Sequence, residues 1–460
     1  MSKKLLEVYG SLSREERKQL KQFVQFSSPT VSKEAQALFN FLYDNYTKKV
    51  FVPTEAFKFL FKARAYDHLV YRRTASDLLK AIERFLIHNE LKKDNDSAQL
   101  YLAKAYRKRK LPKHFESTIK AAKKRKEKEH LAIQDYYFNL CMSQEANLQK
   151  DSERDPSLKT NLEKMGENLD IFFVVNKLKQ LCAKQSYKNV LSEVAELHFE
   201  EEVLNFVHQH QLLNVPLISL YYHTYKMQTE GDKNYFIQVK TAIENYSSAL
   251  TINELKDFYL WCINFCIKSA NQGDKSYYDE LFDIYVAAIE NKALIEHKKL
   301  SAYTYKNIIT LGLRNGHNTW VESFIEQYHS FLDIEFRADF YNYAKAKSAY
   351  VKTELKQATI WLDKVNTKDI FTTIDVRVMQ CKINYELGRF ELLEYMLDNL
   401  KQYLKRQKLK LYHKKIYNNF IKALIRILNL NGSITKTEKL RDIITKEHQI
   451  AEKKWLLEQL

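Results

Sequence analysis

Apolar residues recur along most of this chain every three or four positions, the spacing that gathers them on one face of an α-helix. In the first ninety residues this pattern predicts a compact helical head. A long helix of the head runs from about residue 67 to residue 91. Earlier helix starts are predicted at a capping box of Ser13 with Glu16, at Ser32 and at Pro53.

From about residue 93 onward the pattern becomes pairs of amphipathic helices. In the last third of the chain a turn residue is followed by one apolar position five residues later and by another at nine. The clear instances are Gly316 with Val321 and Ile325, Thr353 with Ala358 and Leu362, and Gly388 with Leu393 and Leu397. Weaker versions surround Gly231 and Gly273, and successive turn residues are 35 to 43 positions apart. Such a period is typical of helical-repeat proteins.

We therefore expect an all-α protein: a small helical head over residues 1–92, followed by an α-solenoid over residues 93–460. The solenoid would be a right-handed superhelix of antiparallel helix pairs, closed by a polar C-terminal capping helix that ends at Leu460. A polar segment that contains Pro156 predicts an internal joint near residues 150–158.

Several segments of the chain resemble known helical-repeat proteins. Residues 386–393, Glu-Leu-Gly-Arg-Phe-Glu-Leu-Leu, resemble the middle of a tetratricopeptide unit. More broadly, the chain resembles a family of uncharacterised bacterial helical-repeat proteins at residues 12–23, at residues 303–307 with Trp320, and at residues 451–457. The resemblance implies one helical-repeat architecture over nearly the whole chain, and it implies no activity.

Composition supports this prediction. The chain has 8 Gly and 5 Pro in 460 residues, where average usage gives roughly 55 of the two together. Hairpins and phosphate-binding loops depend on these residues, so few of either are expected. Five cysteines favour a reducing compartment. There is no apolar run of membrane-spanning length and no signal-peptide pattern, so we expect a cytoplasmic protein without a membrane partner.

No sequence motif identifies a catalytic or metal-binding site. The sequence has no nucleophile elbow, no phosphate-binding loop and no His-Glu-x-x-His zinc motif. Cys262 and Cys266 share a helix face, but their surroundings are apolar and predict core cysteines. His208 and His210 would point to different sides of a helix. We therefore expect no catalytic residue, cofactor or metal. The many aromatic residues are assigned to the core, as in Phe258, Trp261 and Phe265, or Phe336, Phe340 and Tyr343.

The net charge of +17 is concentrated in two clusters. Residues 104–128 hold twelve basic side chains against two acidic ones, and residues 401–416 hold seven basic side chains and no acidic one. If residues 113–129 form a helix, Phe115, Ile119 and Ala122 would be its buried face. Candidate contacts to an anion or a nucleic acid are Arg107, Lys108, Arg109, Lys110, Lys120, Lys123, Lys124, Arg125, Lys126, Lys405, Arg406 and Lys408. Exposed tyrosines of the second cluster, Tyr403 and Tyr412, would stack on bases.

The leading hypothesis is a non-enzymatic scaffold that binds a protein partner through a solenoid surface. The alternative is a nucleic-acid- or ribosome-associated protein that binds RNA or DNA through the two basic clusters. Solvated lysine-rich faces explain the same clusters without any ligand. A helical enzyme without a recognisable motif is the third hypothesis.

Overall fold

The computed structural model describes residues 3–26, 31–45, 52–62, 64–126, 137–138, 141–142, 144, 157–188, 196–430 and 434–460. Within these ranges the secondary structure is helical, apart from a ribbon of two short strands, and this confirms the all-α prediction. The chain divides into two compact units, Met1–Asn176 and Lys177–Leu460.

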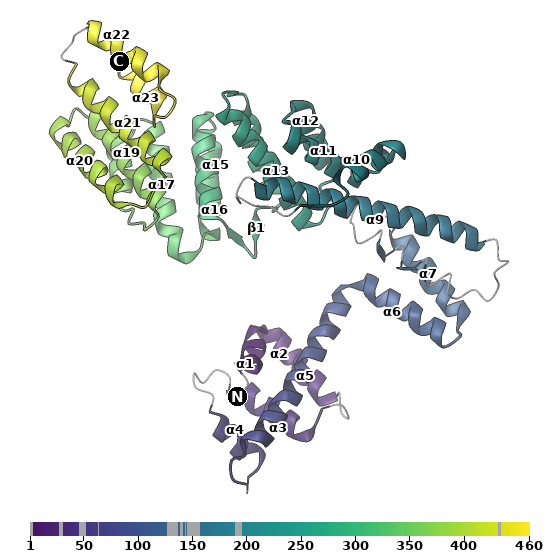
Figure 1. Cartoon of the computed structure of the whole chain (residues 1–460). Helices are drawn as coiled ribbons and strands as arrows, with labels where there is room; N and C mark the ends of the chain where they lie inside the picture. The colour runs from purple at the N-terminus through teal and green to yellow at the C-terminus, as the bar shows by residue number, and fades with distance from the viewer. Residues whose placement is uncertain are drawn as a thin grey trace. The chain divides into compact units, whose positions relative to one another are not determined.

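The first unit begins with five helices that share one core. They are α1 (Lys3–Ser11), α2 (Arg14–Phe26), α3 (Lys33–Asn45), α4 (Pro53–Leu60) and α5 (His68–Lys93) (Figure 1). Their buried residues form a continuous cluster from Leu5 to Phe85. The predicted caps are confirmed: the amide of Glu16 donates to Ser13 Oγ at 3.2 Å, and that of Ala35 donates to Ser32 Oγ at 3.2 Å.

A helix pair follows in the same unit. Helices α6 (Asn95–Lys108) and α7 (Pro112–Lys126) pack against each other around the predicted face of Phe115, Ile119 and Ala122. Helix α9 (Ser157–Lys188) starts in this unit and ends in the next one. The predicted head boundary at residue 92 stays a prediction, and most of the predicted joint lies outside the described residues.

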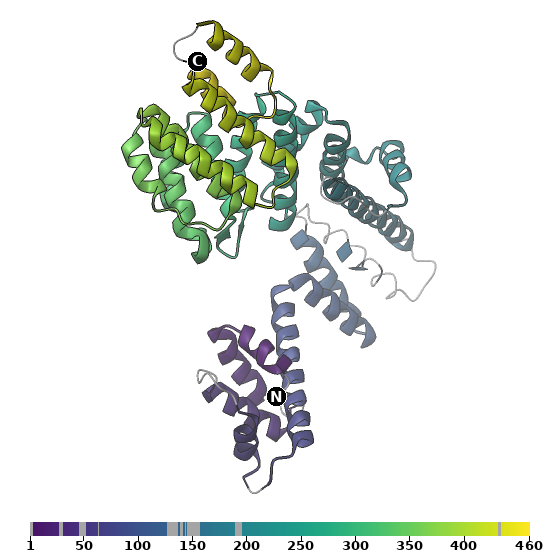
Figure 2. The same ribbon diagram turned by 60° about the vertical axis from the view of Figure 1, so that its left-hand side comes forward.

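In the second unit the helices pack mainly against their neighbours along the chain. Both views show the green to yellow helices of residues 334–428 lying side by side (Figures 1 and 2). The elements are α10 (Glu200–Gln209), η1 (Leu212–Asn214), α11 (Pro216–Glu230), α12 (Lys233–Tyr246), α13 (Ile252–Asn271), α14 (Tyr277–Glu290), β1 (Ile295–Glu296), β2 (Lys299–Leu300), α15 (Ala302–Arg314), α16 (Asn318–Tyr328), η2 (His329–Phe331), α17 (Ile334–Val351), α18 (Leu355–Leu362), α19 (Ile370–Glu386), α20 (Phe390–Arg406), α21 (Leu411–Leu428), α22 (Ile434–Lys446) and α23 (Lys453–Glu458). The helices pack most strongly within the pairs α11–α12, α13–α14, α15–α16, α17–α18 and α19–α20.

The repeated turn pattern is confirmed. The turn residues Gly316, Thr353 and Gly388 all have left-handed backbones, with φ of 83°, 62° and 68°. In each case the amide after the turn residue bonds back to a carbonyl five residues earlier, at 2.8 to 2.9 Å, which closes the end of the preceding helix. The positions five and nine residues after the turn are fully buried: Val321, Ile325, Ala358, Leu362, Leu393 and Leu397.

Left-handed backbones in this chain do not depend on glycine. Among the described residues, more non-glycine residues than glycines have a positive φ. Lys110 and Lys292 close helices in this way, and His297 with Lys298 turns the β1–β2 ribbon. Helix-closing hydrogen bonds and neighbouring packing hold these backbones in place.

The C-terminal capping element is two helices rather than one. Helices α22 and α23 are separated by residues 447–452, and Glu452 has a left-handed φ of 53°. This break turns α23 back, so that the side chains of Trp455 and Leu456 reach the core formed with α19, α20 and α21. A single helix would carry Trp455 away from that core.

We predict that Thr353→Gly stabilises the protein. A β-branched residue at φ 62° pays a steric cost that glycine does not, so the free energy of unfolding should rise by about 0.5–1 kcal/mol. Urea unfolding followed by circular dichroism measures the change. The control, Thr359→Gly, removes a threonine from the interior of α18 and should lower stability. Equal losses in both variants would contradict the prediction.

Gly312 lies where helix α15 comes close to buried side chains of neighbouring helices. A Cβ added at Gly312 would lie 2.5 Å from Val321 Cγ2 and 2.8 Å from Phe282 Cε2, both in buried side chains. Gly312→Ala should therefore lower the free energy of unfolding by about 1–2 kcal/mol despite its better helix propensity. In α9, Gly166→Ala meets no atom within 4 Å and should be neutral or stabilising. A stable Gly312→Ala variant in thermal unfolding would contradict this close packing.

Candidate interaction surface

The first basic cluster lies on helices α6 and α7 and on the turn between them. Arg107 and Lys108 end α6, Arg109 caps it, and Lys110 is the left-handed turn residue. The guanidinium of Arg109 donates to the carbonyl of Ala105 at 3.1 Å. Other candidate side chains here are exposed and have no ion-pair partner among the described residues: Lys108, Lys110 and Lys120.

Four predicted contacts fall at the end of α7. The backbone of residues 123–126 is helical, but the side chains of Lys123, Lys124, Arg125 and Lys126 lie outside what the structure describes. The prediction that they meet Arg107 to Lys110 on one surface therefore stays a prediction.

The second basic cluster joins the end of α20 to the start of α21. Its members Lys405, Arg406 and Lys408 are exposed. In the described part of the chain none of them forms an ion pair, and neither does Lys410 or any other cation of residues 401–415. Several lysines of the preceding helices are paired with carboxylates, as in Lys256–Glu296, Lys345–Glu326 and Lys382–Glu452. This segment therefore carries charge that the unit does not neutralise.

The same end of the unit carries exposed apolar side chains, of which the sequence predicted Tyr412 alone. Ile334 and Leu411, the first residues of α17 and α21, are each 86% exposed. Exposed aromatic residues lie at or near the starts of α15, α17, α19 and α21: Tyr303, Phe336, Phe371 and Tyr412. Phe336 had been predicted to lie in the core, but it is 40% exposed because it lies only one turn from the start of its helix. We call these six residues the apolar edge.

A hydrogen bond and an aromatic contact connect three of the helices that carry the apolar edge. The Tyr303 hydroxyl donates to Asp369 Oδ2 at 2.6 Å, which joins the start of α15 to the cap of α19. The Phe371 ring lies 5.2 Å from that of His413, between centroids, which joins the start of α19 to that of α21. Unpaired cations flank the edge at Lys368, Lys408, Lys410 and Lys414.

The predicted tyrosines of the second cluster behave differently from each other. Tyr412 is 55% exposed and belongs to the apolar edge. Tyr403 is partly buried, and the Arg377 guanidinium lies over its ring at 4.6 Å from the centroid. Of these two tyrosines, only Tyr412 therefore offers an exposed aromatic surface.

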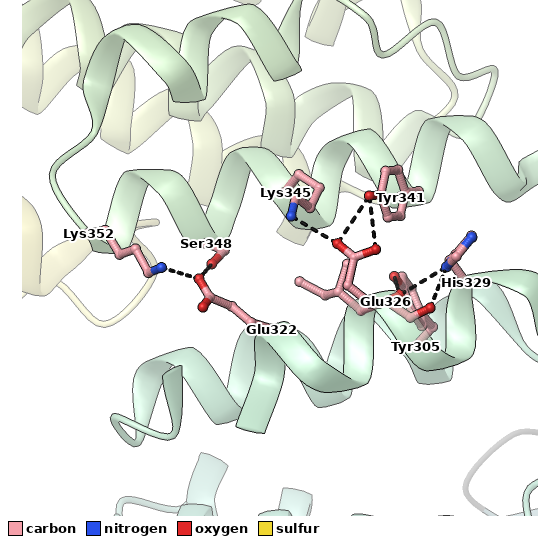
Figure 3. A network of polar contacts seen from close by, with 9 residues as sticks. Tyr305, Glu322, Glu326, His329, Tyr341, Lys345, Ser348 and Lys352 are labelled. Atoms are coloured by element: carbon pink, nitrogen blue, oxygen red, sulfur yellow. Dashed lines mark hydrogen bonds and ion pairs between the residues drawn. The ribbon is translucent and has the colours of Figure 1, made fainter. Parts of the chain in front are cut away.

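Polar bonds fix the helices that present the edge. Between α16 and α17, Glu326 Oε1 accepts from Lys345 Nζ at 2.9 Å and from the Tyr341 hydroxyl at 3.1 Å (Figure 3). Glu322 likewise accepts from Ser348 and Lys352. Lys345 lowers the pKa of Glu326 by a hydrogen bond that favours the carboxylate. These bonds hold α16 of one pair against α17 of the next.

A second network closes the space between the first helices of three pairs. Lys306 on α15 lies 2.6 Å from Asp375 on α19, and Lys382 on α19 bonds to Glu452 at 2.5 Å. Between them Lys347 on α17 donates to Thr310 Oγ1 at 2.9 Å. These bonds connect α15, α17 and α19 to one another through their own polar groups.

Lys347 has no carboxylate partner among the described residues. Burial of its ammonium group lowers its pKa to about 8, while Asp375 and Glu452 act in the opposite direction. Sequence spacing did not reveal this network, because Lys306, Lys347 and Asp375 come from three helices and meet only through packing.

The candidate metal ligands have ordinary structural roles. Cys262 and Cys266 are buried on α13, where burial raises the pKa of both thiols. His208 Nε2 lies 2.7 Å from the Tyr222 hydroxyl, and His210 packs on Phe206. In the described ranges no group of three or more His, Cys, Asp and Glu side chains is placed to hold a metal ion. Their helices also include none with the length and apolar character needed to cross a membrane.

Comparisons with known proteins gave no match. No protein-family model, curated protein or solved structure matches this chain. Function must therefore be argued from the surface itself.

We predict that Lys347→Met removes a pH dependence of stability. The pKa of Lys347 is about 8 in the folded protein and 10.5 in the unfolded chain. Between these pH values the unfolded chain binds more protons than the folded protein, so the free energy of unfolding rises with pH. In the wild-type protein this group should add about 2 kcal/mol to the free energy of unfolding between pH 7.5 and 10. Lys347→Met should lose that gain and be more stable at pH 7.5.

Urea unfolding at several pH values measures this slope. The matched control is Lys345→Met on the same helix, because Lys345 is paired with Glu326. It should leave the slope between pH 7.5 and 10 unchanged. Equal slopes in the wild type and Lys347→Met would show that Lys347 is not held as an uncompensated buried cation.

Proposed function

We propose that this protein is a non-enzymatic scaffold that binds an acidic protein partner through the apolar edge of its second unit. The helix pairs of that unit would form a right-handed superhelix of the tetratricopeptide-like kind, in line with the resemblance to bacterial helical-repeat proteins. Support comes from the packing of each helix on the next and from the repeated left-handed turns.

The observation that carries the proposal is the exposure of Ile334 and Leu411, with the unpaired cations Lys408 and Lys410 next to Leu411. Burying one such side chain yields about 1.5–3 kcal/mol, and aliphatic and aromatic residues are typical of the centre of a protein interface. Lys368, Lys408 and Lys410 would pair with carboxylates around that centre. The partner is therefore expected to carry an apolar patch inside an acidic surface.

The second candidate function is nucleic-acid binding through the two basic clusters. It is favoured by the unpaired cations Lys108, Lys110 and Lys120 on α6 and α7. Phosphate contacts release counterions, so retention on bulk RNA should be strong at about 50 mM salt and lost at about 300 mM. Nearly fully exposed aliphatic residues contribute little to phosphate binding, and for this reason the protein partner is preferred.

We predict that Ile334→Asp with Leu411→Asp abolishes partner binding. Both residues are the first of their helices, where aspartate is compatible with the helix dipole, so the fold should be kept. Affinity purification from source cells, with nuclease present, compares the variant with the wild type. Proteins lost from the variant are then purified and titrated by calorimetry, and the double variant should bind at least a hundredfold more weakly than the wild type.

The matched control is Ile434→Asp, which changes the 76% exposed first residue of α22 in the same unit. It should bind the partner like the wild type. A partner that the double variant still binds at full strength would contradict the proposed surface. Binding that disappears on nuclease treatment would favour the nucleic-acid function instead.

A further inference from the structure

A cleft of about 580 Å³ lies in the second unit, with α19 as its floor and α20 as one wall. The other wall is the end of α18 with the segment that follows it, residues 362–368. Its volume falls within the range of about 300–1,000 Å³ usual for ligand sites. Leu362 and Val376 give it a buried apolar base, and most of the remaining lining is polar.

Several polar side chains in this cleft have no hydrogen-bond or ion-pair partner among the residues that the structure describes. Arg377 is held over the Tyr403 ring, but its guanidinium makes no hydrogen bond or ion pair with any described residue. The same holds for the carboxamides of Gln380 and Asn399 on α19 and α20. Each carboxamide offers both a donor and an acceptor, as a peptide group requires.

The spacing of these groups suits an extended chain. Thr373, Arg377 and Gln380 follow one face of α19 and span about 10 Å at 1.5 Å per residue. That length matches about three residues of an extended peptide. The cleft is lined by two basic residues, Lys368 and Arg377, and one acidic residue, Asp363. This small excess of positive charge favours an anion of low charge over a polyphosphate chain.

We propose that this cleft binds an extended peptide segment that carries an Asp or Glu side chain. The carboxylate pairs with Arg377, and the carboxamides of Gln380 and Asn399 bond to the peptide backbone on either side. The proposal rests on the proposed function, because the segment would belong to the acidic partner. Lys368 lies three residues before Phe371 of the apolar edge, so one partner could reach both.

A random twelve-residue peptide library displayed on phage tests the cleft directly. Selection on the full chain should enrich peptides that contain Asp or Glu, and anisotropy with the synthesised, labelled winners measures their affinity. Arg377→Gln should weaken binding at least tenfold, which corresponds to about 1.4 kcal/mol. Gln380→Ala should weaken it by a smaller factor, and a thermal melt checks that both variants remain folded.

Arg389→Gln is the matched control, because Arg389 is an exposed arginine in the turn before α20 and does not line the cleft. It should bind the selected peptides within twofold of the wild type. Failure to select any peptide, winners without an acidic residue, or winners that bind Arg377→Gln at full strength would each overturn the proposal.

The experiment also separates the cleft from the apolar edge. Peptides that depend on Ile334 and Leu411 but not on Arg377 would reject the cleft and leave the proposed function intact. Peptides that need Arg377, combined with a partner insensitive to Ile334→Asp and Leu411→Asp, would support the cleft and reject the edge.

Discussion

The second unit depends on one constraint: each helix must bury its apolar face against its neighbours along the chain. A left-handed turn residue ends the first helix of a pair, and the side chains five and nine positions later fill the space between the two. Gly312 shows how close this approach is, because even one methyl group would collide with Val321 and Phe282. Packing within this unit is therefore mainly between helices that are neighbours along the chain.

The same constraint explains which apolar side chains remain exposed. Side chains of a helix point back toward its N-terminus, so the first residue of a helix extends beyond the packed surface. Ile334 and Leu411 are exposed for this reason. The sides of α15, α17 and α19 that converge are instead filled by their own lysine and carboxylate groups. The exposed surface of the unit includes the apolar edge and the cleft.

Much of the fold could be predicted from the sequence, because its causes are local. The caps at Ser13 and Ser32, the buried face of α7 and the turn pattern at Gly316 and Gly388 all follow from spacing within a few residues. The turn at Thr353 follows from the same spacing, whereas the left-handed backbone at Lys110 was not evident, because hydrogen bonds rather than residue type hold it.

The candidate site was harder to predict, because it depends on contacts between distant segments. Phe336 has core spacing, yet it is exposed because it lies one turn from the start of α17. Lys347 and Asp375 come together only when three helix pairs are stacked. The basic cluster at residues 401–415 was visible as composition, but its lack of carboxylate partners required the structure.

Hydrogen exchange measured by mass spectrometry tests the proposed surface most directly. It compares the chain alone with its complex with the acidic partner, which wild-type and Ile434→Asp baits both recover. We predict that amides at the starts of α15, α17, α19 and α21 become protected when the acidic partner is added, while those of α6 and α7 do not change. Protection confined to α6 and α7, or no change at those four helix starts, would contradict it.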